Sequence, residues 1–245
     1  MSVARTAATA ARVLSQLRRD PRTLALLLVV PCVLMVLVDQ LFAGREEVFQ
    51  SIGIPMLGLF PLISMFLVTS ITMLRERTTG TLERLLTTPL TKLELLLGYG
   101  VAFAAVATIQ ALLVSIVGFG LLGLESVHSE LLIVALAVAN AILGMAFGLF
   151  VSAFAQTEFQ AVQFMPAFVL PQILLCGLFV DQDQMANWLA VISYLLPVTY
   201  AFDALDRAAH DASLGARFWL DIAVIVGVTF LALGLGAATL RRRTP

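Results

Sequence analysis

The sequence predicts an all-α integral membrane protein with six transmembrane helices. Of the 245 residues, 60% are hydrophobic and 13% are charged, and the mean hydropathy of +0.98 is too high for a soluble domain. Six apolar runs are each about 20 residues long, enough for a helix to cross about 30 Å of hydrocarbon. The basic residues also concentrate between alternate runs. Together these features define a multi-pass helical protein.

Residues 1–22 are predicted to form an amphipathic helix that lies in the cytoplasmic interface of the membrane. Arg5, Arg12 and Arg19 are spaced by seven residues and fall about 180° from an apolar stripe. Such a helix places its arginines near anionic headgroups or an acidic protein surface. Pro21 suits a bend from the membrane plane into the first span. The residues of the stripe are Val3, Ala7, Ala10, Leu14 and Leu17.

Residues 23–245 are predicted to form one six-helix transmembrane domain. Gln110 and Asn140 lie near the middle of the third and fourth spans, so each amide is expected to hydrogen-bond to a neighbouring helix. Gly144 and Gly148 form a G-x-x-x-G motif, which favours close packing within the chain or dimerisation. Pro166 and Pro171 interrupt the fifth span. The predicted spans are 23–41, 52–74, 95–122, 131–154, 164–180 and 218–240.

The distribution of basic residues predicts that both termini are cytoplasmic. Twelve of the fifteen Lys and Arg residues then lie on the cytoplasmic side, as the positive-inside rule requires. Only Arg45, Arg207 and Arg217 lie on the outer side. The twelve are Arg5, Arg12, Arg18, Arg19, Arg22, Arg75, Arg77, Arg84, Lys92, Arg241, Arg242 and Arg243.

A charged segment, 74–98, separates the second and third spans. Gly80 is expected to end one helix, and Thr91 and Glu94 have the capping-box spacing that starts the next. Residues 82–87 are predicted to form a short amphipathic helix that cannot itself be embedded in the membrane. A solvated loop and a docking element for a cytosolic partner both fit this pattern. One face of the helix carries Leu82, Leu85 and Leu86, and the other carries Glu83, Arg84 and Thr87.

The segment 181–217 is predicted to form a helical hairpin that dips into the outer leaflet. Its apolar stretch 185–196 would reach only about 18 Å as a helix, and Pro197 ends it. Joining 185–196 and 198–205 into a seventh span would move the three arginines at 241–243 outside, against the charge rule. Its acidic residues have two possible roles, which are to solvate a loop or to take part in substrate release. They are Asp203, Asp206 and Asp211.

Several chemistries are not encoded in this sequence. Lys92 is the only lysine and does not follow a G-x-x-x-x-G motif, so the chain has no phosphate-binding loop of that type. His128 and His210 fall in outer loops without neighbouring metal ligands, and Cys32 and Cys176 are expected to be packed free thiols. The sequence therefore predicts no catalytic residues, no metal site and no cofactor bound by this chain.

Three motifs carry a resemblance that extends over the chain. Residues 75–90, R-E-R-T-T-G-T-L-E-R-L-L-T-T-P-L, resemble the loop after the second span in type-2 ABC transporter permeases. Residues 17–27, L-R-R-D-P-R-T-L-A-L-L, resemble the family's entry into the first span. Residues 194–205, Y-L-L-P-V-T-Y-A-F-D-A-L, resemble its motif before the last span. Three motifs in the right order are more specific than any one of them.

The resemblance implies a non-catalytic permease subunit in the cytoplasmic membrane. Two such subunits, as a homodimer or a heterodimer, would associate with two copies of a separate ABC ATPase that holds ATP and Mg. The 82–87 helix would be the coupling helix between the permease and the ATPase. The implied coupling residues are Arg75, Glu76, Gly80, Leu82, Glu83, Arg84, Leu85 and Leu86, and the implied substrate pathway includes Phe66, Thr69, Phe168 and Gln172.

The predicted function is ATP-driven export of a hydrophobic or amphipathic substrate, such as a drug, an antibiotic or a lipid-like molecule. Multidrug efflux and antibiotic resistance are the corresponding physiological roles. Export of a polysaccharide or glycolipid by a permease of the same family is one alternative, and an ATP-independent channel or scramblase is another. No charged residue lies at the centre of a predicted span, which weakens the case for an ion-driven antiporter.

Overall fold

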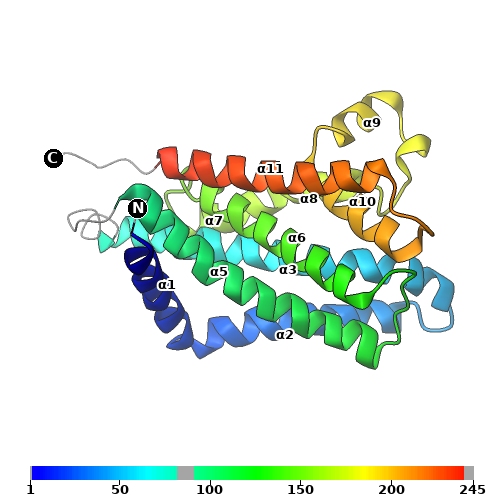
Figure 1. Cartoon of the computed structure of the whole chain (residues 1–245), viewed down its shortest axis with the longest axis horizontal. Coiled ribbons are helices and arrows are strands. Elements are labelled where there is room, and N and C mark those ends of the chain that lie inside the picture. Colours follow the sequence, from blue (N-terminus) through cyan, green and yellow to red (C-terminus); the bar gives the residue numbers. More distant parts are fainter. Residues whose placement is uncertain (1, 82–90, 240–245) are drawn as a thin grey trace.

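The computed structural model describes residues 2–81 and 91–239, and every regular element in this part of the chain is helical. Most helices run along the long axis of the molecule (Figure 1). We call the end with α1, the end of α3 and the start of α5 the α1 end, and the opposite end with α9 and α10 the α10 end. The elements are α1 (Val3–Arg18), α2 (Pro21–Leu41), α3 (Glu46–Thr78), α5 (Lys92–Ser115), the π-helical turn η1 (Ile116–Leu121), α6 (Glu130–Val151), α7 (Glu158–Phe168), α8 (Leu170–Leu175), the 3-10 turn η2 (Gln182–Gln184), α9 (Asn187–Ser193), α10 (Pro197–His210) and α11 (Ala216–Thr239).

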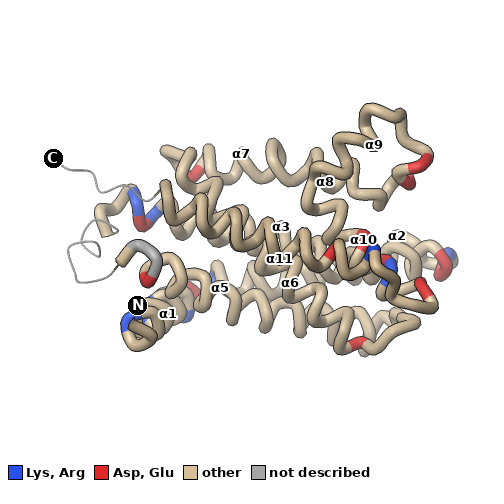
Figure 2. The backbone as a smooth tube through the Cα atoms, turned by 45° about the horizontal axis from the view of Figure 1, so that its top comes forward, with Lys and Arg blue, Asp and Glu red and all other residues tan. Residues whose placement is uncertain are grey.

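Five of the described helices are long and apolar enough to cross a membrane, namely α2, α3, α5 with η1, α6 and α11. They correspond to the predicted first, second, third, fourth and sixth spans, and α3 is longer than predicted at both ends. Charged residues gather at the two ends of the described structure and leave its middle almost uncharged (Figure 2). This distribution suits a protein whose middle lies in hydrocarbon.

Helices α3 and α6 form the centre of the bundle. In each, 61% of the most apolar stretch is buried, compared with 17% in α2 and 22% in α11. Apolar side chains of α2 and α11, such as Leu26 and Phe230, are therefore exposed, as expected for helices that face lipid.

The G-x-x-x-G motif packs α6 against α3 within the chain. A Cβ atom on Gly144 would lie 2.1 Å from the Leu62 carbonyl oxygen, and one on Gly148 would lie 2.4 Å from the Phe66 carbonyl oxygen. Both glycines thus let the two backbones approach more closely than any side chain would allow. Of the two uses that the sequence left open, the structure uses the motif for packing within the chain.

The two mid-span amides hydrogen-bond across helices, as predicted. Asn140 Nδ2 of α6 donates to the Ala201 carbonyl oxygen of α10 at 3.1 Å. Gln110 Nε2 of α5 donates to the Leu27 carbonyl oxygen of α2 at 2.9 Å. Within α2 the residue four positions after Leu27 is Pro31, which has no N–H to donate. The Gln110 side chain therefore supplies a hydrogen bond that the α2 backbone cannot make.

We expect Gln110→Leu to lower the free energy of unfolding by about 1–3 kcal/mol, because the buried Leu27 carbonyl loses its donor. Adding Pro31→Ala restores a backbone N–H at the right position, and the double variant should recover most of the loss. Thermal unfolding in detergent, followed by circular dichroism, measures both changes. Equal melting temperatures for the single and double variants would show that Gln110 does not compensate for Pro31.

The predicted fifth span, 164–180, does not form one continuous helix. Helix α7 ends at Phe168, α8 covers only Leu170–Leu175, and Val169 separates them. Pro171 cannot donate to the carbonyl group four residues before it, so the helix is interrupted at this point. Residues 176–181 then continue without helical structure. The predicted interruption at Pro171 is therefore confirmed, whereas Pro166 lies inside α7 and the helical part ends before 180.

The segment before α11 is bent, as its proline predicted. Helices α9 and α10 meet at an angle of 85° around 194–196, and α10 begins at Pro197. Thr199 Oγ1 donates to the Ser193 carbonyl oxygen at 2.8 Å, and the Tyr200 hydroxyl donates to the Tyr194 carbonyl oxygen at 2.7 Å. These bonds satisfy the last carbonyls of α9 and hold the bend. The depth of this segment in a membrane stays a prediction.

Candidate functional site

The helix α1 is bound to the end of α3 through one arginine. Arg12 Nη1 donates to Glu76 Oε1 at 3.1 Å, and Arg12 Nη2 donates to the hydroxyl of Tyr99 on α5. The Arg12 guanidinium also lies over the Tyr99 ring, 5.5 Å from its centroid. Glu76 is 6% exposed and the Arg12 side chain is 28% exposed, so this is a partly buried charged pair with a hydrogen-bonded neighbour.

The same helix is bound to the start of α5. Thr91 and Glu94 form the predicted capping box, in which the Thr91 hydroxyl accepts from the Glu94 amide and Glu94 Oε2 accepts from the Thr91 amide. Glu94 Oε1 accepts from the backbone amide of Ser2 at 2.6 Å, and Arg5 lies 3.8 Å from Glu94 Oε2. Glu94 therefore caps α5 and holds the start of α1 in place.

A close backbone approach accompanies these polar contacts. A Cβ atom on Gly98 of α5 would lie 2.5 Å from Cβ of Thr9, so α1 crosses α5 at this glycine. Thr9, Ala10 and Val13 are the buried residues of α1, whereas Leu14 in the predicted apolar stripe is exposed. The stripe therefore points partly away from the bundle, and Arg12 faces the acidic protein surface that α3 provides.

Arg75 makes a second connection at the α1 end. Its Nε donates to Glu158 Oε1 of α7 at 2.7 Å and its Nη2 donates to Glu158 Oε2 at 3.1 Å. The hydrogen bonds from Arg75 hold the pKa of the Glu158 carboxyl below its usual range. Both side chains are about half exposed, so the pair contributes about 0–1 kcal/mol to stability. Its geometry nevertheless joins the end of α3 to the first residue of α7.

Gly80 ends α3 in the way that the sequence predicts. Its φ is +72°, a conformation that glycine adopts without strain, and it follows the C-cap residue Thr79. The other predicted coupling residues, Leu82, Glu83, Arg84, Leu85 and Leu86, lie outside the described residues. Arg75, Glu76 and Gly80 thus lie just before the predicted coupling helix 82–87, and their roles in coupling stay predictions.

The four predicted pathway residues lie on α3 and the broken α7–α8 segment. The rings of Phe66 and Phe168 stack with centroids 6.2 Å apart, so the structure brings these two together. Thr69 is fully buried, and its hydroxyl lies 3.3 Å from the Met145 carbonyl oxygen of α6. Gln172 Nε2 donates to the Phe168 carbonyl oxygen at 2.9 Å. Phe168 is the only one of the four that is not fully or almost fully buried.

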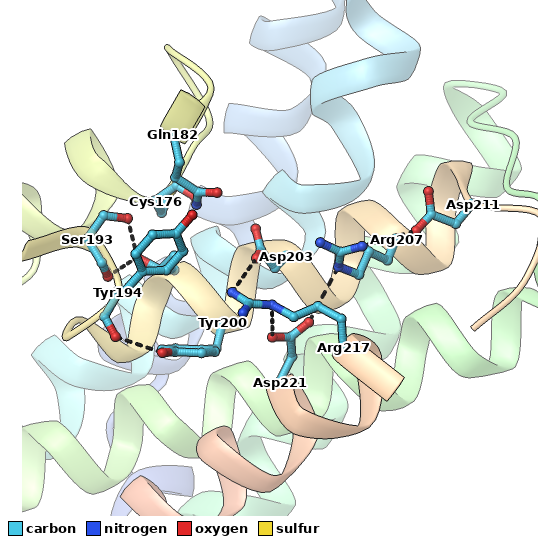
Figure 3. Close-up of polar contacts among 11 residues, drawn as sticks. Cys176, Gln182, Ser193, Tyr194, Tyr200, Asp203, Arg207, Asp211, Arg217 and Asp221 are labelled. Carbon is cyan, nitrogen blue, oxygen red and sulfur yellow. Dashed lines mark hydrogen bonds and ion pairs between the residues drawn. The ribbon is translucent and has the colours of Figure 1, made fainter. Parts of the chain in front are cut away.

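A second charged cluster lies at the α10 end, between α10 and α11 (Figure 3). The side chain of Asp221 on α11 is 0% exposed and lies between two arginines. Arg207 Nε is 3.6 Å from Asp221 Oδ2, and Arg217 Nε is 3.5 Å from Asp221 Oδ1. Arg217 Nη2 is also 3.6 Å from Asp203 Oδ2 of α10. Four charged groups thereby join the bent segment to the last long helix.

Two tyrosines complete this cluster. The Arg217 guanidinium lies 5.6 Å from the ring centroids of both Tyr194 and Tyr200, which is the distance of a cation–π contact. Asp206 of α10 and Asp211, which follows its last residue, also have partners, since Asp206 pairs with His210 at 3.1 Å and Asp211 pairs with Arg207 at 3.4 Å. All three predicted acidic residues of this region are therefore paired with a basic residue.

Sequence reasoning missed the partners in both clusters. Asp221 is the only acidic residue in the predicted last span, and Arg217 precedes it by four residues, so this spacing was an available signal. Arg77 is partly buried, and its Nε and Nη2 atoms are buried without a hydrogen-bond partner among the described residues. No pattern in the sequence distinguishes Arg77 from Arg75.

Five long apolar helices, uncharged in the middle and charged at both ends, define this molecule as a multi-pass helical membrane protein. The chain belongs to the ABC-2 type transporter family, whose sequence profile matches residues 5–208. The match includes α1, the end of α3 and the start of α5, and it extends through most of α10.

Three curated relatives resemble the chain. It is 29% identical to the probable multidrug ABC transporter permease YbhR of Escherichia coli K12 over 189 residues, which are 77% of this chain and 51% of YbhR. It is 25% identical to the probable multidrug ABC transporter permease YbhS of the same organism, over 72% of this chain and 47% of YbhS. A third relative is ABC transporter G family member 20 of Dictyostelium discoideum, at 25% identity over 68% of this chain and 24% of that protein. The chain thus spans about half the length of the two bacterial relatives.

Proposed function

We propose that this chain is the transmembrane permease subunit of an ATP-driven ABC exporter. Membership of the ABC-2 type transporter family supports this proposal, as do the apolar spans and the two relatives whose names describe multidrug permeases. A separate ABC ATPase, in two copies, binds ATP and Mg and contacts the α1 end. A second permease subunit, identical or homologous, completes the transporter in the cytoplasmic membrane.

One observation carries the proposed mechanism: α1 is bound to both helices that flank residues 82–90. Glu76 near the end of α3 binds Arg12, and Glu94 near the start of α5 binds the Ser2 amide. A force applied to the intervening segment must therefore move α3, α5 and α1 together. Closure of the ATPases supplies that force, and the bundle responds by changing which side of the membrane its pathway faces.

The proposed substrate is hydrophobic or amphipathic, such as a drug, an antibiotic or a lipid-like molecule. The partly exposed ring of Phe168, with Phe66 stacked on it, supports an aromatic lining where α3 meets α7. The buried side chains of Thr69 and Gln172 join this lining when the bundle opens the pathway. Aromatic rings with a few polar groups are typical of sites that bind such compounds.

The test removes two charges, Glu83 and Arg84, from the predicted coupling helix 82–87, which we call the coupling segment. We expect Glu83→Ala combined with Arg84→Ala to weaken association with the ATPase at least about tenfold, because interfacial ion pairs are lost, which corresponds to about 1.4 kcal/mol. Co-purification from cells that express both subunits, and ATP hydrolysis in nanodiscs, measure the change. A matched control, Arg45→Ala with Glu125→Ala, removes one exposed charge of each sign at the α10 end. Wild-type association and hydrolysis in the first variant would remove this segment from the mechanism.

A further inference from the structure

A cavity of about 360 Å³ lies at the α1 end, between α1, the start of α2 and the last turns of α3. Its volume is in the range of small-molecule sites. Part of its lining is apolar and comes from α1, α3 and α5, namely Val13, Leu17, Val68, Ile71 and Phe103. A molecule bound here would contact α1 and α3 at once, next to the Arg12–Glu76 pair.

Two carboxylates line the same cavity. Glu76 is 6% exposed, and its Oε1 accepts hydrogen bonds from Arg12 and Gln16 at 3.1 and 3.4 Å. Its other oxygen, Oε2, is buried and accepts no hydrogen bond from the described residues. This oxygen has almost no accessible surface, and the hydroxyl of Tyr99, which accepts from Arg12, also interacts with the Glu76 carboxylate. Glu76 therefore contributes negative charge beside the cavity rather than an open hydrogen-bond acceptor.

Asp20 is the second carboxylate. It accepts hydrogen bonds from the Thr23 amide and hydroxyl at 3.1 and 2.6 Å, which hold the pKa of its carboxyl below the usual range. Asp20 is therefore ionised at neutral pH. The one basic residue that lines the cavity, Arg75, is engaged in its bidentate pair with Glu158. Arg12 is likewise paired with Glu76. Together, Arg12, Glu76, Arg75, Glu158 and Asp20 carry one net negative charge, which favours a positively charged ligand over a negative one.

The ligand class follows from these two features. An organic cation suits the site better than a hydrated metal ion, because much of the lining of the cavity is apolar. A primary ammonium group carries three N–H donors, which suit the carboxylate oxygens of Asp20, and its positive charge is attracted by both carboxylates. We propose that this cavity binds an aliphatic primary amine, either a free amphipathic amine or a phospholipid with an ethanolamine headgroup. Binding does not depend on transport, so it is tested on the full chain without an ATPase.

The probe is a ten-carbon primary amine with a diazirine at its far end, and the matched probe is the corresponding alcohol. The chain is placed in nanodiscs of phosphatidylcholine and phosphatidylglycerol, irradiated with each probe and digested for mass spectrometry. We expect the amine to label peptides with Val13, Leu17, Val68, Ile71 or Phe103 about tenfold more than the alcohol at equal concentration. Equal labelling by the two probes would overturn the proposal.

Two variants remove different halves of the site. Glu76→Gln removes the negative charge, and Val68→Phe fills the apolar part while keeping the Arg12–Glu76 pair. Each should reduce labelling by the amine about tenfold, whereas Glu46→Gln, at the other end of α3, should leave it unchanged. Undiminished labelling in both cavity variants would contradict the assignment.

A further arm separates the two sources of the amine. Nanodiscs that also contain phosphatidylethanolamine are labelled in the same way. Competition by this lipid identifies a headgroup as the natural ligand, and undiminished labelling identifies a free amine.

Discussion

Replacing Gly144 by alanine is expected to destabilise the bundle by about 3 kcal/mol or more, which is the upper range for overpacking a core. The added Cβ would lie 2.1 Å from the Leu62 carbonyl oxygen and 2.8 Å from the Leu62 Cα. These are backbone atoms of the central helix α3, so no side chain can rotate away to make room. The apparent melting temperature in detergent should fall by about 6–12 °C.

Gly227→Ala is the matched control. Gly227 is exposed on α11, and a Cβ there would meet no atom within 4 Å. Because alanine is also the better helix former, the melting temperature of this variant should stay the same or rise. A wild-type melting temperature for Gly144→Ala would mean that α3 and α6 are not packed as described.

Replacing Arg217 by leucine is expected to cost about 3 kcal/mol. The fully buried Asp221 would lose one of its two positive partners, and Asp203 would lose its contact at 3.6 Å. Removing one member of a buried ion pair typically costs 3–5 kcal/mol, and we expect the lower value because Arg207 still lies 3.6 Å from Asp221. Thermal unfolding measures the loss.

A second substitution distinguishes a charge effect from a packing effect. Adding Asp221→Leu to Arg217→Leu removes the buried charge, and the double variant should be more stable than the single one. Arg45→Leu, an exposed arginine at the same end, is expected to change stability by less than about 0.5 kcal/mol. If the double variant were the less stable, the loss would be assigned to the aliphatic part of Arg217.

Local patterns in the sequence predicted much of the fold. Runs of apolar residues predicted five of the long helices. Local capping motifs predicted two of the helix ends, at Gly80 and at the Thr91–Glu94 capping box. The mid-span amides were predicted to hydrogen-bond because an unpaired amide in hydrocarbon is costly. In the fifth span, the predicted interruption at Pro171 is confirmed, whereas Pro166 lies inside α7 without ending it, because the pattern does not show which proline a helix tolerates.

The candidate site could be predicted only in part, because its contacts join residues that are far apart in the chain. Arg12 and Glu76 are separated by 64 positions, and Ser2 and Glu94 by 92. A helical wheel of α1 shows that Arg12 is on the polar face but not that this face meets Glu76. The pairing of Asp221 with Arg207 likewise depends on the bend at Pro197, which brings α10 against α11.

Cross-linking from the α1 end tests the central claim most directly. A photoreactive amino acid at Thr81, the last described residue before the coupling segment, is compared with the same amino acid at Ser126, at the α10 end. If the chain is a permease driven through its α1 end, Thr81 forms a cross-link to the co-expressed ATPase that changes with ATP, and Ser126 forms none. A cross-link from Ser126 alone, or from neither position, would contradict the account.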